Sequence, residues 1–101
     1  MDIEDWRAKI DIIDQKLTEL VNERAKAAQE IGRLKRNSSL PIYEPGREAL
    51  VFENVSRSNR GPLPTSELLR IFERIIDVMR SLQRVEMETD SRQISTEKEH
   101  I

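Results

Sequence analysis

Apolar side chains recur in steps of three and four residues from about residue 3 to residue 36. This stripe consists of Ile3, Trp6, Ile10, Ile13, Leu17, Leu20, Arg24, Ala27, Ile31 and Leu34. The period predicts one long amphipathic helix, with Asp2 as its N-cap and the polar and proline positions of residues 37–41 as its end. Such a helix is about 50 Å long. Because the rest of the chain cannot easily cover that length, the pattern favours burial of the stripe against a partner chain.

Two further helices are expected. Pro45 suits the first position of a short helix that ends before Gly61 and Pro62. A third helix is predicted from about Thr65 to about Glu88, and its stripe consists of Leu68, Leu69, Phe72, Ile75, Ile76, Met79, Leu82 and then Gln83. The pattern therefore predicts an all-α fold with one helical domain over residues 1–88. Residues 89–101 are polar, and we expect them to form a flexible C-terminal tail.

Composition excludes several classes of function. The net charge of -2, from 17 basic and 19 acidic residues, argues against a broad nucleic-acid surface. The absence of cysteine excludes disulfides and thiol chemistry, and the single histidine, His100, makes a histidine metal site or catalytic triad very unfavourable. The first residues do not resemble a signal peptide, and no apolar run has membrane-spanning length. We therefore expect a cytoplasmic protein without a membrane partner.

Two cations interrupt the apolar pattern of the first helix. Arg24 occupies a stripe position, and burying an arginine costs several kcal/mol unless it is paired. Lys35 projects within roughly 20° of Arg24 and about 16 Å further along the axis, and Ala28 between them leaves room for a small ligand. Each cation also has an ordinary structural role open to it. Arg24 could pair with an acid of a partner chain or fix its register, and Lys35 could stabilise the helix C-terminus.

Polar residues also stand at or near apolar stripes in the other predicted helices. Glu48 could be an acid favourable to its helix dipole, and Gln83 could mark the end of the core. The set as a whole is Arg24, Lys35, Arg47, Glu48 and Gln83. No nucleophile–base pair, metal-ligand cluster or glycine-rich phosphate loop accompanies it. Cations with one acid and one amide suit the binding and electrostatic stabilisation of a small anionic molecule.

The chain resembles the all-helical class of chorismate mutase over about residues 4 to 86. The matching motifs are Trp6-Arg7-Ala8-Lys9-Ile10-Asp11, Ile13-Asp14-Gln15-Lys16-Leu17, Glu23-Arg24, Ile31-Gly32-Arg33-Leu34-Lys35, Pro41-Ile42-Tyr43-Glu44, Arg47-Glu48, and Ile71-Phe72-Glu73-Arg74-Ile75-Ile76 continuing to Gln83. The resemblance implies an isomerase that rearranges chorismate to prephenate in an intramolecular Claisen-type step. It also implies no cofactor, no metal and an intertwined homodimer with two identical sites.

The resemblance implies a role for each site residue. As catalytic groups, Lys35 would contact the breaking ether oxygen and a carboxylate, and Gln83 would donate to the same ether oxygen. Arg24 and the partner chain's copy of Arg7 would bind substrate carboxylates. Arg7 lies about 25 Å from Arg24 on the same helix and points roughly 100° away, so helix geometry agrees with a contribution across the dimer. Glu48 would hold the substrate hydroxyl. The segment from Glu44 to Arg47 would contribute mainly backbone contacts and closure over the substrate.

Two positions depart from the family pattern. Met79 stands where a serine often contacts a carboxylate, so this contact is expected to be lost or replaced. Glu44 stands where a shorter aspartate is common, which leaves its role open.

Three alternatives also stay open: an isochorismate-pyruvate lyase on the same fold, a non-catalytic helical dimer or regulatory module, and a mutase domain detached from a larger bifunctional enzyme. Glu48, suited to the substrate hydroxyl, favours the mutase over the lyase.

Overall fold

Three helices form the chain, and the predicted all-α fold is confirmed. The computed structural model describes residues 1–38 and 40–100, with their side chains up to Glu88. Over these residues it contains α1 (Ile3–Arg36), α2 (Pro45–Ser58) and α3 (Thr65–His100), and no strand. All three helices begin at the residues that the sequence predicts.

Local signals account for these boundaries. The Asp2 carboxylate accepts a 2.9 Å hydrogen bond from the backbone N–H of Asp5, whose own carboxylate accepts from the backbone of Asp2, a complete capping box. Pro45 opens α2, where its missing N–H is not needed. Gly61 has a φ of 74°, a conformation that favours glycine, and it lies in the turn that separates α2 from α3.

The end of α3 differs from the prediction. The helix continues past Glu88 to His100. Residues 89–100 contain neither glycine nor proline, so no residue there interrupts helical propagation once packing has nucleated the helix. The side chains of residues 89–101 are outside the described part of the structure, so the flexibility of this tail stays a prediction.

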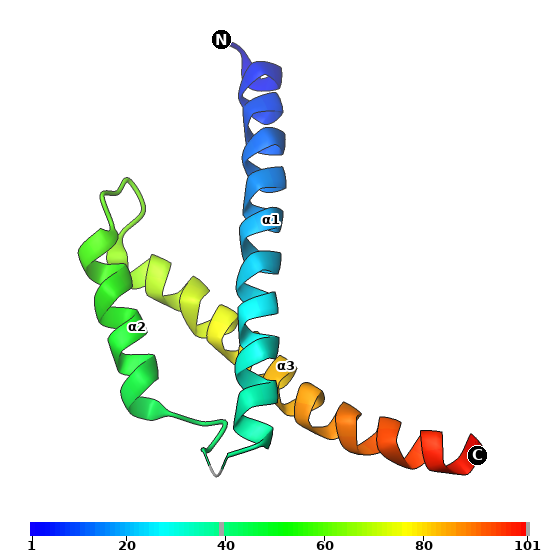
Figure 1. Ribbon diagram of the computed structural model, residues 1–101. Helices are drawn as coiled ribbons and strands as arrows, with labels where there is room; N and C mark the ends of the chain where they lie inside the picture. The colour runs from blue at the N-terminus through cyan, green and yellow to red at the C-terminus, as the bar shows by residue number, and fades with distance from the viewer. Residues whose placement is uncertain (39, 101) are drawn as a thin grey trace.

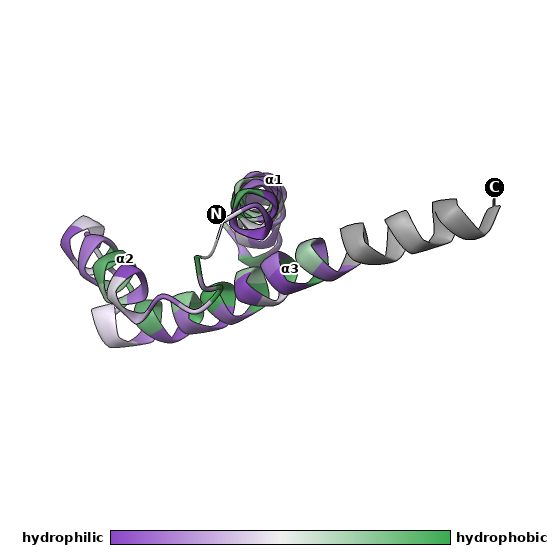
Figure 2. Cartoon of the chain, turned by 60° about the horizontal axis from the view of Figure 1, so that its bottom comes forward, coloured by the Kyte–Doolittle hydropathy of each residue, from purple (hydrophilic) through white to green (hydrophobic). Residues whose placement is uncertain are grey.

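Helices α1 and α2 both pack against α3 but not against each other in the described part of the chain. Figure 2 looks nearly along α1 and shows α1 and α2 standing apart on one side of α3. The small core lies where α1 crosses α3 and consists of Ala28, Ile76 and Met79. Residues of all three helices line a cavity between α1 and α2.

The N-terminal half of α1 projects away from the other helices (Figure 1). Its apolar stripe is uncovered in the single chain, with exposures between 51% and 67% at Ile3, Trp6, Ile10, Ile13, Leu17 and Leu20. The radius of gyration is 18.2 Å, against about 13 Å for a compact domain of 100 residues. Among the described residues, we find no helical stretch with the length and hydrophobicity of a membrane span.

Candidate active site

A cavity of about 390 Å³ lies between α1 and α2, with α3 as its floor. Its apolar walls include Ala28, Ile31 and Val51. Its polar lining consists of the cations Arg24, Lys35, Arg47 and Arg80, the carboxylates Glu44 and Glu48, and the amide of Gln83. The volume is suitable for a small molecule, and the excess of cations favours an anionic one.

Lys35 is the buried cation of this cavity, with only 6% of its surface exposed. Its Nζ donates to Oε1 of Gln83 at 3.0 Å and to the backbone carbonyl of Ile42 at 3.3 Å, and it lies 2.9 Å from Oε1 of Glu44. An ammonium group has three N–H donors, and these three acceptors match them. The side chain of Glu44, whose role the sequence left open, therefore enters the cavity as the counter-ion of Lys35.

Gly32 explains why Lys35 and Gln83 meet. A Cβ atom at residue 32 would lie 3.1 Å from both Cα and the carbonyl oxygen of Gln83, tighter than most Cβ contacts in proteins, so Gln83 would have to shift slightly. Glycine thus allows the backbones of α1 and α3 to approach at this level, one turn before Lys35. Because Oε1 of Gln83 accepts the hydrogen bond from Lys35, its amide NH₂ remains as a donor.

Arg24 and Arg47 line the cavity from α1 and α2. Neither guanidinium forms a hydrogen bond or ion pair with a residue in the described part of the chain. The guanidinium of Arg24 is therefore not neutralised by the described residues, which leaves it available to an anionic ligand or to an acid of a partner chain. Both groups are suited to bidentate contacts with carboxylates.

Glu48 forms an ion pair with an arginine that the sequence analysis did not single out. Nη2 of Arg80 lies 2.7 and 2.6 Å from the two carboxylate oxygens of Glu48, and its guanidinium carbon lies 5.0 Å from the ring centre of Tyr43. The hydrogen bond with Glu48 raises the pKa of Arg80, as expected for a guanidinium paired with a carboxylate. One signal could have revealed this residue: Arg80 precedes Gln83 by three residues and so shares its helix face.

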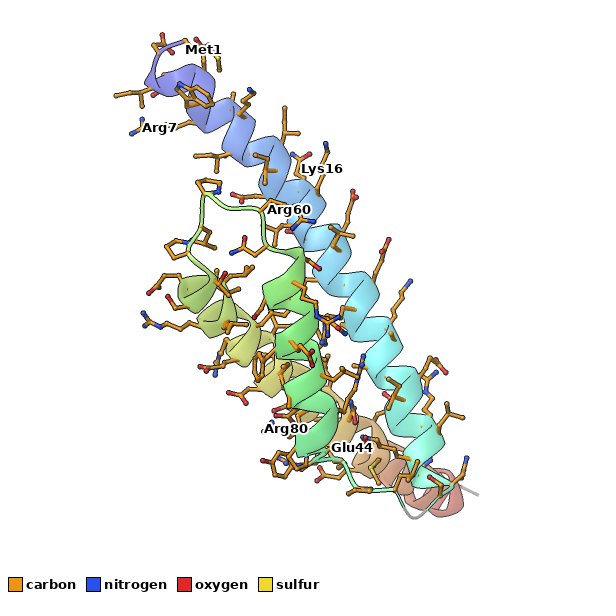
Figure 3. The ribbon with its side chains drawn as sticks, turned by 90° about the vertical axis from the view of Figure 1, so that its left-hand side faces the viewer. Met1, Arg7, Lys16, Glu44, Arg60 and Arg80 are labelled. Atoms are coloured by element: carbon orange, nitrogen blue, oxygen red, sulfur yellow. The ribbon has the colours of Figure 1, made fainter. Side chains whose placement is uncertain are left out.

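All predicted site residues except Arg7 line the cavity, including Met79, which is 3% exposed and provides no hydrogen-bond donor. Arg7 lies near the N-terminal end of α1, at the opposite end of the molecule from Glu44 and Arg80 (Figure 3). Its guanidinium pairs with Glu4 on the same helix at 2.8 Å. A single chain therefore brings together every predicted site residue but the one expected to come from a partner.

Comparisons with known proteins identify one family. The sequence model of the family "Chorismate mutase type II" matches residues 6–84. The bifunctional chorismate mutase/prephenate dehydratase of Aquifex aeolicus is 38% identical over 87 residues, covering 82% of this chain but 24% of the relative. The chorismate mutase of Methanocaldococcus jannaschii is 28% identical and covers 81% of this chain and 84% of the relative. The chain thus spans about a quarter of the length of the bifunctional relative.

Solved structures show the same fold. Chorismate mutase (Form II) from Thermus thermophilus superposes with a TM-score of 0.79 at 30% identity, covering 81% of this chain and 93% of that one. Chorismate mutase from Helicobacter pylori, solved in complex with prephenate, superposes with a TM-score of 0.77 at 28% identity and covers 85% and 93%. With the family model matching most of its length, the chain belongs to the type II chorismate mutase family.

Proposed function

We propose that this chain catalyses the rearrangement of chorismate to prephenate, a step of aromatic amino acid biosynthesis. Family membership supports the proposal, as does the similarity to a Helicobacter pylori enzyme solved with prephenate. The reaction breaks a carbon–oxygen bond and forms a carbon–carbon bond within one molecule. It needs no nucleophile or proton transfer, which suits a cavity lined by cations, carboxylates and an amide.

The observation that carries the proposal is the contact between Lys35 and Gln83 inside the cavity. Negative charge develops on the ether oxygen as its bond to carbon breaks. A buried ammonium and a fixed amide donor stabilise that charge more in the transition state than in the ground state. Since both donors are already fixed by the helix crossing, little reorganisation is required during the reaction.

The remaining polar groups suit the other parts of the substrate. Chorismate carries two carboxylates and one ring hydroxyl. Arg24 binds one carboxylate, and Glu48 accepts a hydrogen bond from the hydroxyl. The segment from Glu44 to Arg47 closes over the bound molecule. Holding both ends of the substrate selects the folded conformer in which the reacting carbons approach each other.

Lys35 must exchange a partner when the substrate binds, because its three donors are matched by protein acceptors. Glu44 is the acceptor most easily replaced, since its side chain is 39% exposed and sits at the start of α2. Release of the Glu44 carboxylate frees one N–H of Lys35 for the ether oxygen of the substrate, and the substrate carboxylate that lies beside it replaces the lost negative charge near the ammonium.

We further propose that the functional unit is an intertwined homodimer. The uncovered apolar stripe of α1 supports this assembly, since a second copy of the helix can cover it. In such a dimer Arg7 binds a carboxylate in the partner's site. The expected cytoplasmic location belongs to the same proposal.

A direct assay of purified protein tests the proposed activity. Chorismate and isochorismate are supplied separately, and prephenate and pyruvate are measured as products. We expect chorismate to give prephenate in equal amount. Pyruvate from isochorismate at a higher kcat/KM would identify the lyase instead, and turnover of neither substrate by a folded dimer would favour the non-catalytic module.

A further inference from the structure

Arg80 is a charged residue of the cavity wall to which the proposed reaction assigns no role. Its side chain is 25% exposed and that of its partner Glu48 is 22% exposed, so both groups are largely removed from water. Contact of one Nη2 with both carboxylate oxygens, at 2.7 and 2.6 Å, fixes the carboxylate from one side. Charge-assisted hydrogen bonds of this length are among the strong ones in proteins.

The guanidinium of Arg80 is itself held in place. Its carbon lies 5.0 Å from the centre of the Tyr43 ring, within the range of a cation–π contact. Tyr43 belongs to the segment before α2, Glu48 to α2 and Arg80 to α3. Arg80 therefore connects α3, the floor of the cavity, both to α2 through Glu48 and to the segment before α2 through Tyr43. An arginine whose plane is fixed in this way loses little further freedom when it orients a carboxylate.

We propose that Arg80 is a positioning residue, which holds the Glu48 carboxylate in the orientation that accepts a hydrogen bond from the ring hydroxyl of the substrate. Each carboxylate oxygen has two lone pairs, and the contact with Arg80 uses one of them on each oxygen. The other lone pairs remain for the substrate. This inference rests on the proposed function of the site.

Two competing roles for Arg80 give different experimental results. Arg80 could bind a substrate carboxylate directly, in place of the contact that Met79 cannot make, and the effect of removing it would then persist when Glu48 no longer carries a charge. It could instead only join α2 to α3 through Glu48, and R80M would then lower the unfolding temperature without lowering kcat of the folded variant. A residue that acts through Glu48 instead loses its effect in that background.

The experiment compares R80M, E48Q and the double variant in the full chain, with chorismate as substrate. Methionine keeps the apolar stem of arginine and removes its charge and donors. We expect each single variant to lose about tenfold in kcat/KM, and R80M to add less than about twofold in the E48Q background. R80K should recover part of the loss. R70M is the matched control, since Arg70 is an exposed α3 arginine paired with Glu67 and does not line the cavity.

Wild-type kinetics in R80M, or equal effects of R80M with and without E48Q, would overturn the inference. Helical circular dichroism and thermal unfolding establish that each variant is folded, and R80K replaces R80M in the cycle if R80M is not. The proposed function is judged separately, from the wild-type chain. An active wild type with an ineffective R80M refutes only the role of Arg80, whereas an inactive wild type refutes both.

Discussion

Nζ of Lys35, near the C-terminal end of α1, lies 3.0 Å from Oε1 of Gln83 on α3. The contact joins residues 48 positions apart in the sequence. It determines which end of the Gln83 amide accepts and which end donates. A cation and an amide donor are thus placed side by side in a cavity that the rest of the chain lines with groups suited to carboxylates and a hydroxyl.

Replacing Gln83 by glutamate should make kcat/KM increase as the pH falls. An amide donates at every pH, whereas a carboxyl group donates only when protonated. We expect Gln83→Glu to lose activity at neutral pH and recover it as the pH falls, while the wild-type rate changes much less over the same range. The measurement is kcat/KM for chorismate between about pH 4 and 8, a range that spans the titration of a carboxyl group. An unchanged pH profile would remove Gln83 from the ether-oxygen role.

Gly32→Ala should reduce activity more than stability. Alanine gains about 1 kcal/mol of helix propensity over glycine, which offsets part of the cost of moving Gln83 away from a Cβ that would lie at 3.1 Å. A displacement of a few tenths of an ångström at a catalytic donor is expected to cost roughly tenfold in kcat. Ala25→Gly in the same helix is a useful comparison, because it changes helix propensity at a residue that does not line the cavity. If Gly32→Ala keeps full kcat, the close approach of the two backbones does not matter for catalysis.

Arg24→Ala distinguishes an enzyme from an assembly module. Removal of a charge-assisted contact to a substrate carboxylate should lower kcat/KM by about a hundredfold or more, chiefly through KM if the contact is equally strong in the ground state. Size-exclusion chromatography and circular dichroism check that the variant is folded and still dimeric. Full mutase turnover by this variant would contradict the carboxylate role.

Mixing two inactive variants tests whether sites are shared between chains. A heterodimer of Arg7→Ala with Arg24→Ala contains one site with both arginines intact and one site with neither. Random exchange of chains should therefore restore about a quarter of the wild-type activity. No recovery after demonstrated chain exchange, or a fully active monomer, would contradict the contribution of Arg7 across the dimer.

The helix starts and most of the residues that line the cavity could be predicted, because both leave local signals in the sequence. Caps and breakers such as Asp2 and Pro45 act locally, and a polar residue such as Arg24 or Gln83 is conspicuous when it replaces an apolar residue in a stripe. The long first helix, the three-helix fold and the family resemblance are confirmed by the structure and the comparisons.

The residues that the sequence did not reveal depend on contacts between helices. Arg80 stands beside the apolar stripe of α3, where an arginine is ordinarily solvated, and only the position of α2 brings Glu48 to it. The close approach at Gly32 likewise follows from where α1 crosses α3. The ion pair between Lys35 and Glu44 depends on the path of the segment between α1 and α2. None of these three contacts produces a periodic pattern in the sequence from which it could be predicted.

The most direct test of the account is the rate at which the purified chain converts chorismate to prephenate, compared with that of Lys35→Met. The account predicts prephenate in equal amount to the chorismate consumed, no pyruvate, and a loss of at least about a hundredfold in kcat for the folded variant, as expected when a preorganised donor to a developing oxyanion is removed. Conversion at the uncatalysed rate by the wild-type dimer, or an unchanged kcat in Lys35→Met, would contradict it.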